Sequence, residues 1–109
     1  GNNSTDGPFV VVDDGATGFR PAFLIIKEYS GSNNGMWFMR DSARSPYNST
    51  DLDLYANSTD AEYTDSNSDI DFTANGFKIR ANAGGYNESG AKNLYIAFAD
   101  QPFNLAKAR

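Results

Sequence analysis

Residues 22–40 read AFLIIKEYSGSNNGMWFMR, and the fold prediction starts from this segment. Its first part, residues 22–29, is apolar on both sides of an extended chain, which predicts a strand covered on both faces and therefore central in a sheet. The sequence SGSNNG at 30–35 is typical of a hairpin loop. A second apolar run, MWFMR at 36–40, follows, so the segment predicts an antiparallel pair of strands.

Four further runs outside this pair have strand character. Residues 77–82 alternate between apolar and polar side chains, which predicts a strand with one face in water. Residues 94–99 form a nearly continuous apolar run, which predicts a second central strand. Shorter strands are predicted at 9–12, which DDG at 13–15 closes with a turn, and at 52–56.

The composition also favours strands joined by turns. Six Tyr, eight Phe and one Trp accompany many Gly, Asn, Ser and Thr residues. We expect an all-β domain, a small antiparallel β-sandwich of jelly-roll or lectin-like form, with a long irregular loop at 41–71. It should be a single domain over residues 1–109 with a short C-terminal tail at 104–109. Because the first residue is Gly rather than Met, we expect a fragment or terminal domain of a larger protein.

Missing residue types restrict the chemistry. The chain has no Cys and no His, which excludes disulfides, thiolates and every nucleophile that relies on a histidine base. The net charge is −5, from 14 acidic and 9 basic residues, which argues against nucleic acid as a partner. No apolar run approaches the roughly 20 residues that a membrane-spanning helix needs, so no membrane insertion is expected. Paired carboxylates could hydrolyse a glycoside, but the sequence brings no two of them together, and we predict that the chain is not an enzyme.

The tetrapeptide NSTD occurs three times, at 3–6, 48–51 and 57–60. The spacings of 45 and 9 residues exclude a regular repeat. Each copy also contains the N-x-S/T triplet of a glycan acceptor, although such triplets arise by composition in a chain this rich in Asn, Ser and Thr. We interpret the copies as local turns, because these side chains bond to the backbone one or two residues away.

The segment 51–71 contains half of the acidic residues and is the candidate metal site. The sequence DSNSD at 65–69 matches the start of an EF-hand calcium loop, but Ile70 and Gly76 stand where that loop needs Gly and Glu. An EF-hand is therefore rejected. A looser oxygen site for calcium would use Asp65, Asn67, Asp69 and Asp71, with Asp51 and Asp53 as further carboxylates. The alternative is that these carboxylates are solvated and form local turns, with no cofactor bound.

Aromatic rings give a candidate sugar site. The rings considered for stacking on a sugar are Trp37, Tyr47, Tyr55, Tyr63 and Tyr86. Trp37 lies inside a strand and is expected in the core. Tyr86 lies in the Gly-rich loop 83–90 and is expected to be exposed, with Asn87 and Glu88 beside it as polar contacts. The predicted ligand-binding residues are therefore Tyr86, Asn87 and Glu88.

Three charged residues, Arg40, Asp41 and Arg44, follow the second strand. The planar guanidinium of Arg can bind a carboxylate or two carbonyl groups at once. We therefore expect salt bridges and hydrogen bonds that fasten the loop 41–71 to the sheet, in preference to an anion-binding site.

Five segments together resemble a known family. In chain order they read STDGPFV (4–10), TGFRPAFLIIK (17–27), MRDSARSPYN (39–48), ANGFKIR (74–80) and NESGAKNLYIAFADQPF (87–103). The pattern is similar to a C-terminal domain of tail and fibre proteins from tailed bacteriophages and covers almost the whole chain. The blocks GFRPAF and YIAFADQPF are its most specific parts.

The resemblance implies a virion component that works outside cells and assembles with other virion proteins and with copies of itself, as a trimer or another homo-oligomer. It supplies no catalytic residues. We therefore expect a non-enzymatic structural and interaction domain of a tail fibre or tail-associated protein, active in host-surface attachment or fibre assembly. The loops 30–35, 51–71 and 83–90 would face the host or a neighbouring protein. Two alternatives stay open: a carbohydrate-binding module for a host cell-surface glycan, with or without calcium, and a capsid decoration or head-fibre domain.

Overall fold

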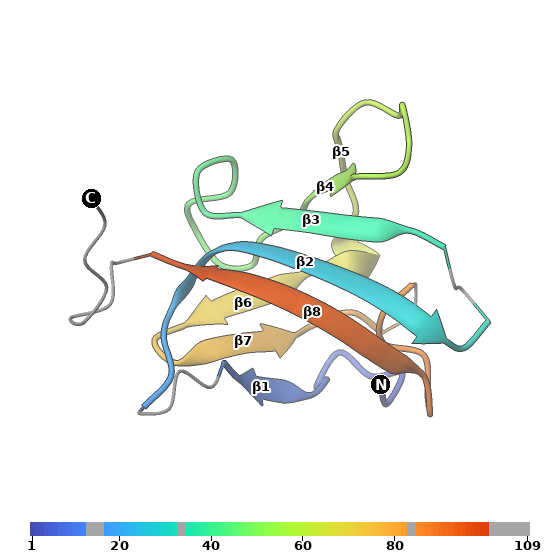
Figure 1. Cartoon of the computed structure of the whole chain (residues 1–109), viewed down its shortest axis with the longest axis horizontal. Helices are drawn as coiled ribbons and strands as arrows, with labels where there is room; N and C mark the ends of the chain where they lie inside the picture. Colours follow the sequence, from blue (N-terminus) through green and yellow to red (C-terminus); the bar gives the residue numbers. More distant parts are fainter. Residues whose placement is uncertain (13–16, 33–34, 83–84, 101–109) are drawn as a thin grey trace.

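A computed structural model describes residues 1–12, 17–32, 35–82 and 85–100. They form two antiparallel sheets that pack as a small β-sandwich (Figure 1), which confirms the predicted all-β fold. One sheet has three strands in the order β1 (Phe9–Val11), β7 (Gly76–Ile79) and β6 (Ile70–Thr73). The other has five, in the order β5 (Tyr63–Thr64), β4 (Leu52–Tyr55), β3 (Trp37–Asp41), β2 (Pro21–Ser30) and β8 (Lys92–Ala99). The predicted turn at 13–15 and tail at 104–109 lie outside the described residues.

The predicted pair of strands is confirmed as β2 and β3. Ile25 of β2 is paired with Met39 of β3 in an antiparallel ladder. Leu24 and Ile26 point into the sandwich and are buried, while Ile25, on the opposite face, is only half-buried. Proline at the first position of β2 is compatible with a ladder, because its missing N–H falls at the strand's start.

The prediction that residues 94–99 form a central strand is wrong for the part of the chain that the structure describes. Strand β8 pairs with β2 alone and is the edge of the five-stranded sheet. Its apolar side chains lie on both faces, as a central strand requires, but one face is exposed: Leu94, Ile96 and Phe98 retain 49%, 43% and 56% of their accessible surface. The local sequence shows that a strand is apolar on both faces, but it does not show with which strands it pairs.

The segment 41–71 is more ordered than the long irregular loop that the sequence predicted. It contains β4 at the expected place, the short strand β5, and a 3-10 turn, η1 (Ser66–Ser68). Buried polar residues supply the contacts that apolar residues could not, because few apolar side chains occur here. Within the described residues η1 is the one helical element, and no helix is long and apolar enough to cross a membrane.

The core lies between the two sheets. The predicted alternation at 77–82 is confirmed, since Phe77, Ile79 and Ala81 are buried while Arg80 and Asn82 are exposed. The buried apolar side chains are Val12, Leu24, Ile26, Phe38, Ile70, Phe72, Phe77, Ile79, Ala81 and Tyr86. The three-stranded sheet therefore covers one face of the five-stranded sheet.

Two of the three NSTD copies form the local turns that we predicted. The hydroxyl oxygens of Ser4 and Ser58 accept hydrogen bonds from the backbone N–H groups of Asp6 and Asp60, both at 3.1 Å. The copy at 48–51 differs: the side-chain amide of Asn48 donates to the carbonyl oxygen of Phe72 at 2.8 Å and accepts from its N–H at 2.9 Å. This copy fastens a loop to a strand.

Asparagine amides repeat this role elsewhere in the fold. The amide of Asn57 donates to the Gly35 carbonyl oxygen and accepts from the N–H of Trp37. The fully buried amide of Asn87 donates to the carbonyl oxygens of Ser4 and Ala81. We call Asn48, Asn57 and Asn87 the bridging asparagines, because each amide pairs with backbone as a neighbouring strand would.

We expect Asn87→Ala to lower the free energy of unfolding by about 2–3 kcal/mol, because it leaves buried carbonyl groups unpaired. Chemical denaturation measures the change. Asn82→Ala is the matched control, since Asn82 is exposed, and it should change stability by less than about 0.5 kcal/mol. Equal stabilities for the two variants would show that the Asn87 amide does not hold the N-terminal segment.

Candidate functional site

A buried polar cluster joins β3, β4 and η1. Nη2 of Arg40 forms an ion pair with Asp53 and donates to the carbonyl and hydroxyl oxygens of Ser68, both at 2.6 Å. The Ser68 hydroxyl donates to Oδ2 of Asp53 at 2.6 Å, and the Tyr86 hydroxyl donates to the Ser68 carbonyl oxygen. Burial raises the pKa of Asp53, against the effects of Ser68 and Arg40, and burial also raises the pKa of Tyr86. Arg40 and Asp53 are fully buried, so a substrate could not reach them. The cluster instead holds β3, β4 and η1 together.

The expectation that Tyr86 is an exposed ring is wrong. Its side chain is 1% exposed, and the ring packs edge-on against Phe38 with centroids 4.7 Å apart. Asn87 is fully buried. Glu88 accepts hydrogen bonds from the N–H and hydroxyl of Ser32, both at 2.7 Å. The three residues are adjacent in sequence but contact the core, the N-terminal segment and the loop after β2, so they do not form one sugar-binding surface.

The three carboxylates among the predicted metal ligands also have separate partners. Asp65 caps η1 by accepting from the N–H of Asn67 at 2.9 Å. Asp69 accepts from the Ser49 hydroxyl at 2.7 Å, and Asp71 accepts from Nε of Arg80 at 2.7 Å. Among the described residues no three acidic side chains gather closely enough to hold a metal ion. Asp65 forms a local turn of the kind that the sequence left as the alternative, and Asp71 forms an ion pair that the sequence did not predict.

The predicted fastening by Arg40, Asp41 and Arg44 is confirmed. Arg44 forms ion pairs with Asp41 and Glu62 and donates to the Met39 carbonyl oxygen at 3.2 Å. Burial raises the pKa of Asp41, but the hydrogen bonds from Arg44 outweigh it and leave that pKa below its ordinary value. The start of the 41–71 segment is therefore tied to β3.

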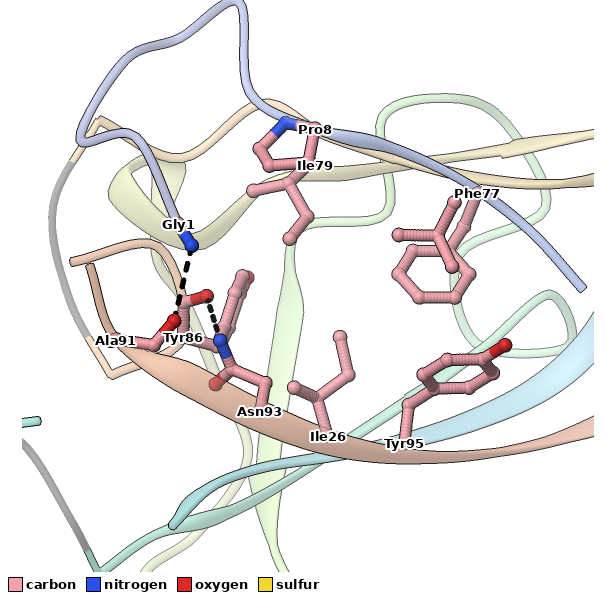
Figure 2. Close-up of a pocket in the computed structure, with 10 residues that line it drawn as sticks. Gly1, Pro8, Ile26, Phe77, Ile79, Tyr86, Ala91, Asn93 and Tyr95 are labelled. Atoms are coloured by element: carbon pink, nitrogen blue, oxygen red, sulfur yellow. Dashed lines mark hydrogen bonds between the residues drawn. The ribbon is translucent and has the colours of Figure 1, made fainter. Parts of the chain in front are cut away.

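A pocket opens between the two sheets at the side where β1 faces β8 (Figure 2). Its volume is about 220 Å³. Ile26, Phe77 and Ile79 form the apolar interior, and the ring of Tyr95 packs edge-on against Phe77. The full lining is Gly1, Pro8, Val10, Ile26, Phe77, Ile79, Tyr86, Ala91, Asn93 and Tyr95. Of the residues that the structure describes, no carboxylate, Lys or Arg side chain belongs to this lining, so the lining suits a small apolar group and offers no acid–base pair of charged side chains.

A shallow groove of about 330 Å³ lies in the loop between β3 and β4. Tyr47 lines it and is 83% exposed, the most exposed of the large apolar side chains in the described residues. The other lining residues are Arg44, Ser45, Pro46, Asn48, Ser49, Asp51 and Leu52. Of the rings that the sequence proposed for sugar stacking, Tyr47 is therefore the one placed at an open polar groove.

Among the described residues, exposed and half-buried apolar side chains gather on the side of the five-stranded sheet that faces away from the core. We call it the outer face. Register places three rows on it: Phe23 beside Phe98, Ile25 between Met39 and Ile96, and Lys27 between Trp37 and Leu94. Leu54 extends the middle row through its pairing with Met39. The outer face therefore crosses β4, β3, β2 and β8, while the three-stranded sheet packs on the opposite side.

Trp37 lies on this outer face. The prediction that it lies in the core is therefore wrong. Trp37 is half-buried, and the Lys27 ammonium lies 5.4 Å from its ring centroid in a cation–π contact. The sequence contained a signal for the outer face that our prediction did not use. Residues 22–29 and 94–99 carry apolar side chains on both faces of their strands, so burying all of them requires a packing layer on each face of the sheet. The three-stranded sheet covers one face only.

Comparison with known proteins gives one match. The family described as "Domain of unknown function (DUF7483)" matches residues 1–102. No curated protein and no solved structure matches.

The hydrogen bonds from Ser32 lower the pKa of Glu88 below its ordinary value of 4.5. A carboxylate with a lowered pKa stabilises the fold above its unfolded-state pKa and loses this contribution as the pH falls through its folded-state pKa. We therefore expect Glu88→Gln to lower the free energy of unfolding at neutral pH, with the difference from the parent chain closing in acid. Urea denaturation across a pH series measures it.

The control for this prediction keeps the acceptor and removes one of its two donors, the Ser32 hydroxyl, while the backbone N–H stays. Ser32→Ala should raise the Glu88 pKa toward 4.5 in an NMR titration of the carboxyl carbon. A difference between parent and Glu88→Gln that persists unchanged at acid pH would contradict the assigned role.

Proposed function

The chain belongs to the DUF7483 family, and we propose that it is a non-enzymatic structural and interaction domain of a bacteriophage particle. The observation that carries the interaction role is the outer face, an apolar sheet surface that extends over four strands. A soluble monomer rarely exposes so large a continuous apolar patch unless the patch binds something. The sequence resemblance to tail and fibre proteins supports the assignment to a phage.

The chemistry of the chain supports a role without catalysis. It contains neither His nor Cys. The most elaborate polar cluster, around Arg40 and Asp53, is closed to solvent and holds strands together. The open pocket between the sheets is lined without carboxylates or cationic side chains. The polar residues of this domain thus serve the fold, and its exposed apolar residues remain for a partner.

We place the domain in the tail, as part of a fibre or a tail-associated protein. Its partners there are neighbouring virion proteins and copies of itself. A fibre presents many copies of each domain, so weak individual contacts add to a firm attachment. Assembly through the outer face does not depend on redox conditions, because the chain has no cysteine.

Labelling of intact particles tests the position. An antibody fragment against the domain, applied to purified particles of the phage that encodes it, should decorate the tail or its fibres in electron micrographs. Particles that lack the gene serve as the control. Label on the capsid would support the decoration or head-fibre alternative and contradict the tail assignment, and particles without the chain would contradict the virion role altogether.

Tyr47 supports a second candidate function, binding of a host cell-surface glycan. The exposed ring beside a polar groove is the arrangement that stacks on a sugar while neighbouring groups bind its hydroxyls. On a glycan array, the parent chain should bind at least one glycan, and Tyr47→Ala should reduce that binding at least about tenfold, the loss of about 1.4 kcal/mol.

The control variant is Phe9→Ala, which removes a ring that is 47% exposed and belongs to β1, outside both the groove and the outer face. It should bind as the parent does. Binding that is equal for parent and Tyr47→Ala, or absent from the array with and without calcium, would end the glycan hypothesis.

A further inference from the structure

We propose that two copies of this chain pack through their outer faces and form a face-to-face dimer. The inference rests on the proposed role of the outer face as an interaction surface, and it names the partner as a second copy. Three features of the face carry it: its area, its self-complementary rows and the position of its one central charge.

The exposed area suits a dimer interface. Tyr29, Leu94, Ile96 and Phe98 are 60%, 49%, 43% and 56% exposed. At about 200 Å² for a large apolar side chain, these fractions amount to roughly 400 Å². The half-buried side chains of the face add further apolar area toward the ~800 Å² that each partner buries in a standard interface. They are Phe23, Ile25, Trp37, Met39, Leu52 and Leu54.

A two-fold axis can set the apolar middle row of the outer face against the same row of a second copy. The middle row, from Leu54 through Met39 and Ile25 to Ile96, is entirely apolar and crosses the sheet. A two-fold interface brings the same patch of both copies together, so an axis that passes over Ile25 sets this row against its own copy. Two sheets then stack about 10 Å apart, as the two sheets of a sandwich do.

Lys27 determines the direction of stacking. It lies on the central strand β2, two residues from Ile25, and its ammonium is near the Trp37 ring. If the two β2 strands ran parallel, the two ammonium groups would meet within an apolar interface, which is costly. In the antiparallel arrangement they lie at opposite ends, about 13 Å apart along the strands, and each Lys27 faces the row of the other copy that contains Phe23 and Asp41. We therefore assign the antiparallel arrangement.

Paired variants test the face. Sedimentation equilibrium of the parent chain, over a series that reaches high micromolar concentration, should show a monomer–dimer equilibrium. Ile96→Glu places a carboxylate in the apolar middle row and should weaken the dimer at least about 100-fold. Val11→Glu is the matched control, because Val11 of β1 is similarly exposed at 48% but lies on the other sheet, and it should dimerise as the parent does. Circular dichroism verifies that both variants fold.

A single cysteine tests the geometry. Because the chain has no cysteine, Ile25→Cys gives each copy a single thiol, and a bismaleimide that spans about 10 Å, the separation of two stacked sheets, should join the two copies rapidly near the two-fold axis. Val11→Cys should not cross-link. A chain that stays monomeric at every concentration overturns the proposal, as does a dimer that survives Ile96→Glu. Pairing of copies through the β8 edges would leave the Ile25→Cys thiols apart and would also overturn it.

The results separate this inference from the proposed function. A monomeric chain that is found in phage tails overturns the dimer and leaves the virion role. A chain that forms the predicted dimer but is missing from the particles supports the dimer and overturns the virion role.

Discussion

The buried ion pair between Arg40 and Asp53 is the interaction on which the organisation of this small sandwich depends. Two charges removed from water stabilise a fold only when their geometry is good and their remaining bonding positions are filled, and removing one partner from such a pair costs about 3–5 kcal/mol. Ser68 meets this condition in part by bonding to both, while Nε and Nη1 of Arg40 have no hydrogen-bond partner in the described part of the chain. The pair thereby fixes the positions of β3, β4 and the η1 turn, and it replaces the apolar contacts that the polar segment 41–71 cannot provide.

The use of polar contacts in the segment 41–71 accounts for the distribution of apolar side chains in the fold. With polar contacts holding the 41–71 segment, the aromatic and aliphatic side chains concentrate in β2, β3, β7 and β8. A three-stranded sheet covers one side of the five-stranded sheet, and the other side retains apolar residues in register across its strands. The fold thus buries several polar residues beside an ordinary apolar core, and it leaves apolar side chains exposed on one face of the five-stranded sheet.

The sequence predicted those parts of the fold that local pattern determines. The β2–β3 pair and the alternation at 77–82 follow from side-chain periodicity and turn residues, and both are present. The position of β8 depends on which strands pair, and an apolar run has no local mark for that. The prediction that the Tyr86 ring is exposed failed for a related reason: its burial is fixed by Phe38 and Ser68, which are distant in sequence. A Gly-rich surrounding predicted exposure, and tertiary contacts overrode it.

The bridging asparagines make the fold sensitive to deamidation, the slow conversion of Asn to a carboxylate. Each amide acts as donor and acceptor together, because its nitrogen meets a carbonyl oxygen while its oxygen meets an N–H. Slow hydrolysis of an amide to a carboxylate keeps the acceptor but replaces the donor with a negative oxygen, which then faces a carbonyl oxygen. Asn48 and Asn57 are each followed by Ser, a small residue that hinders this reaction little. Ageing of the protein would therefore loosen the segments that these amides hold before it affected the apolar core.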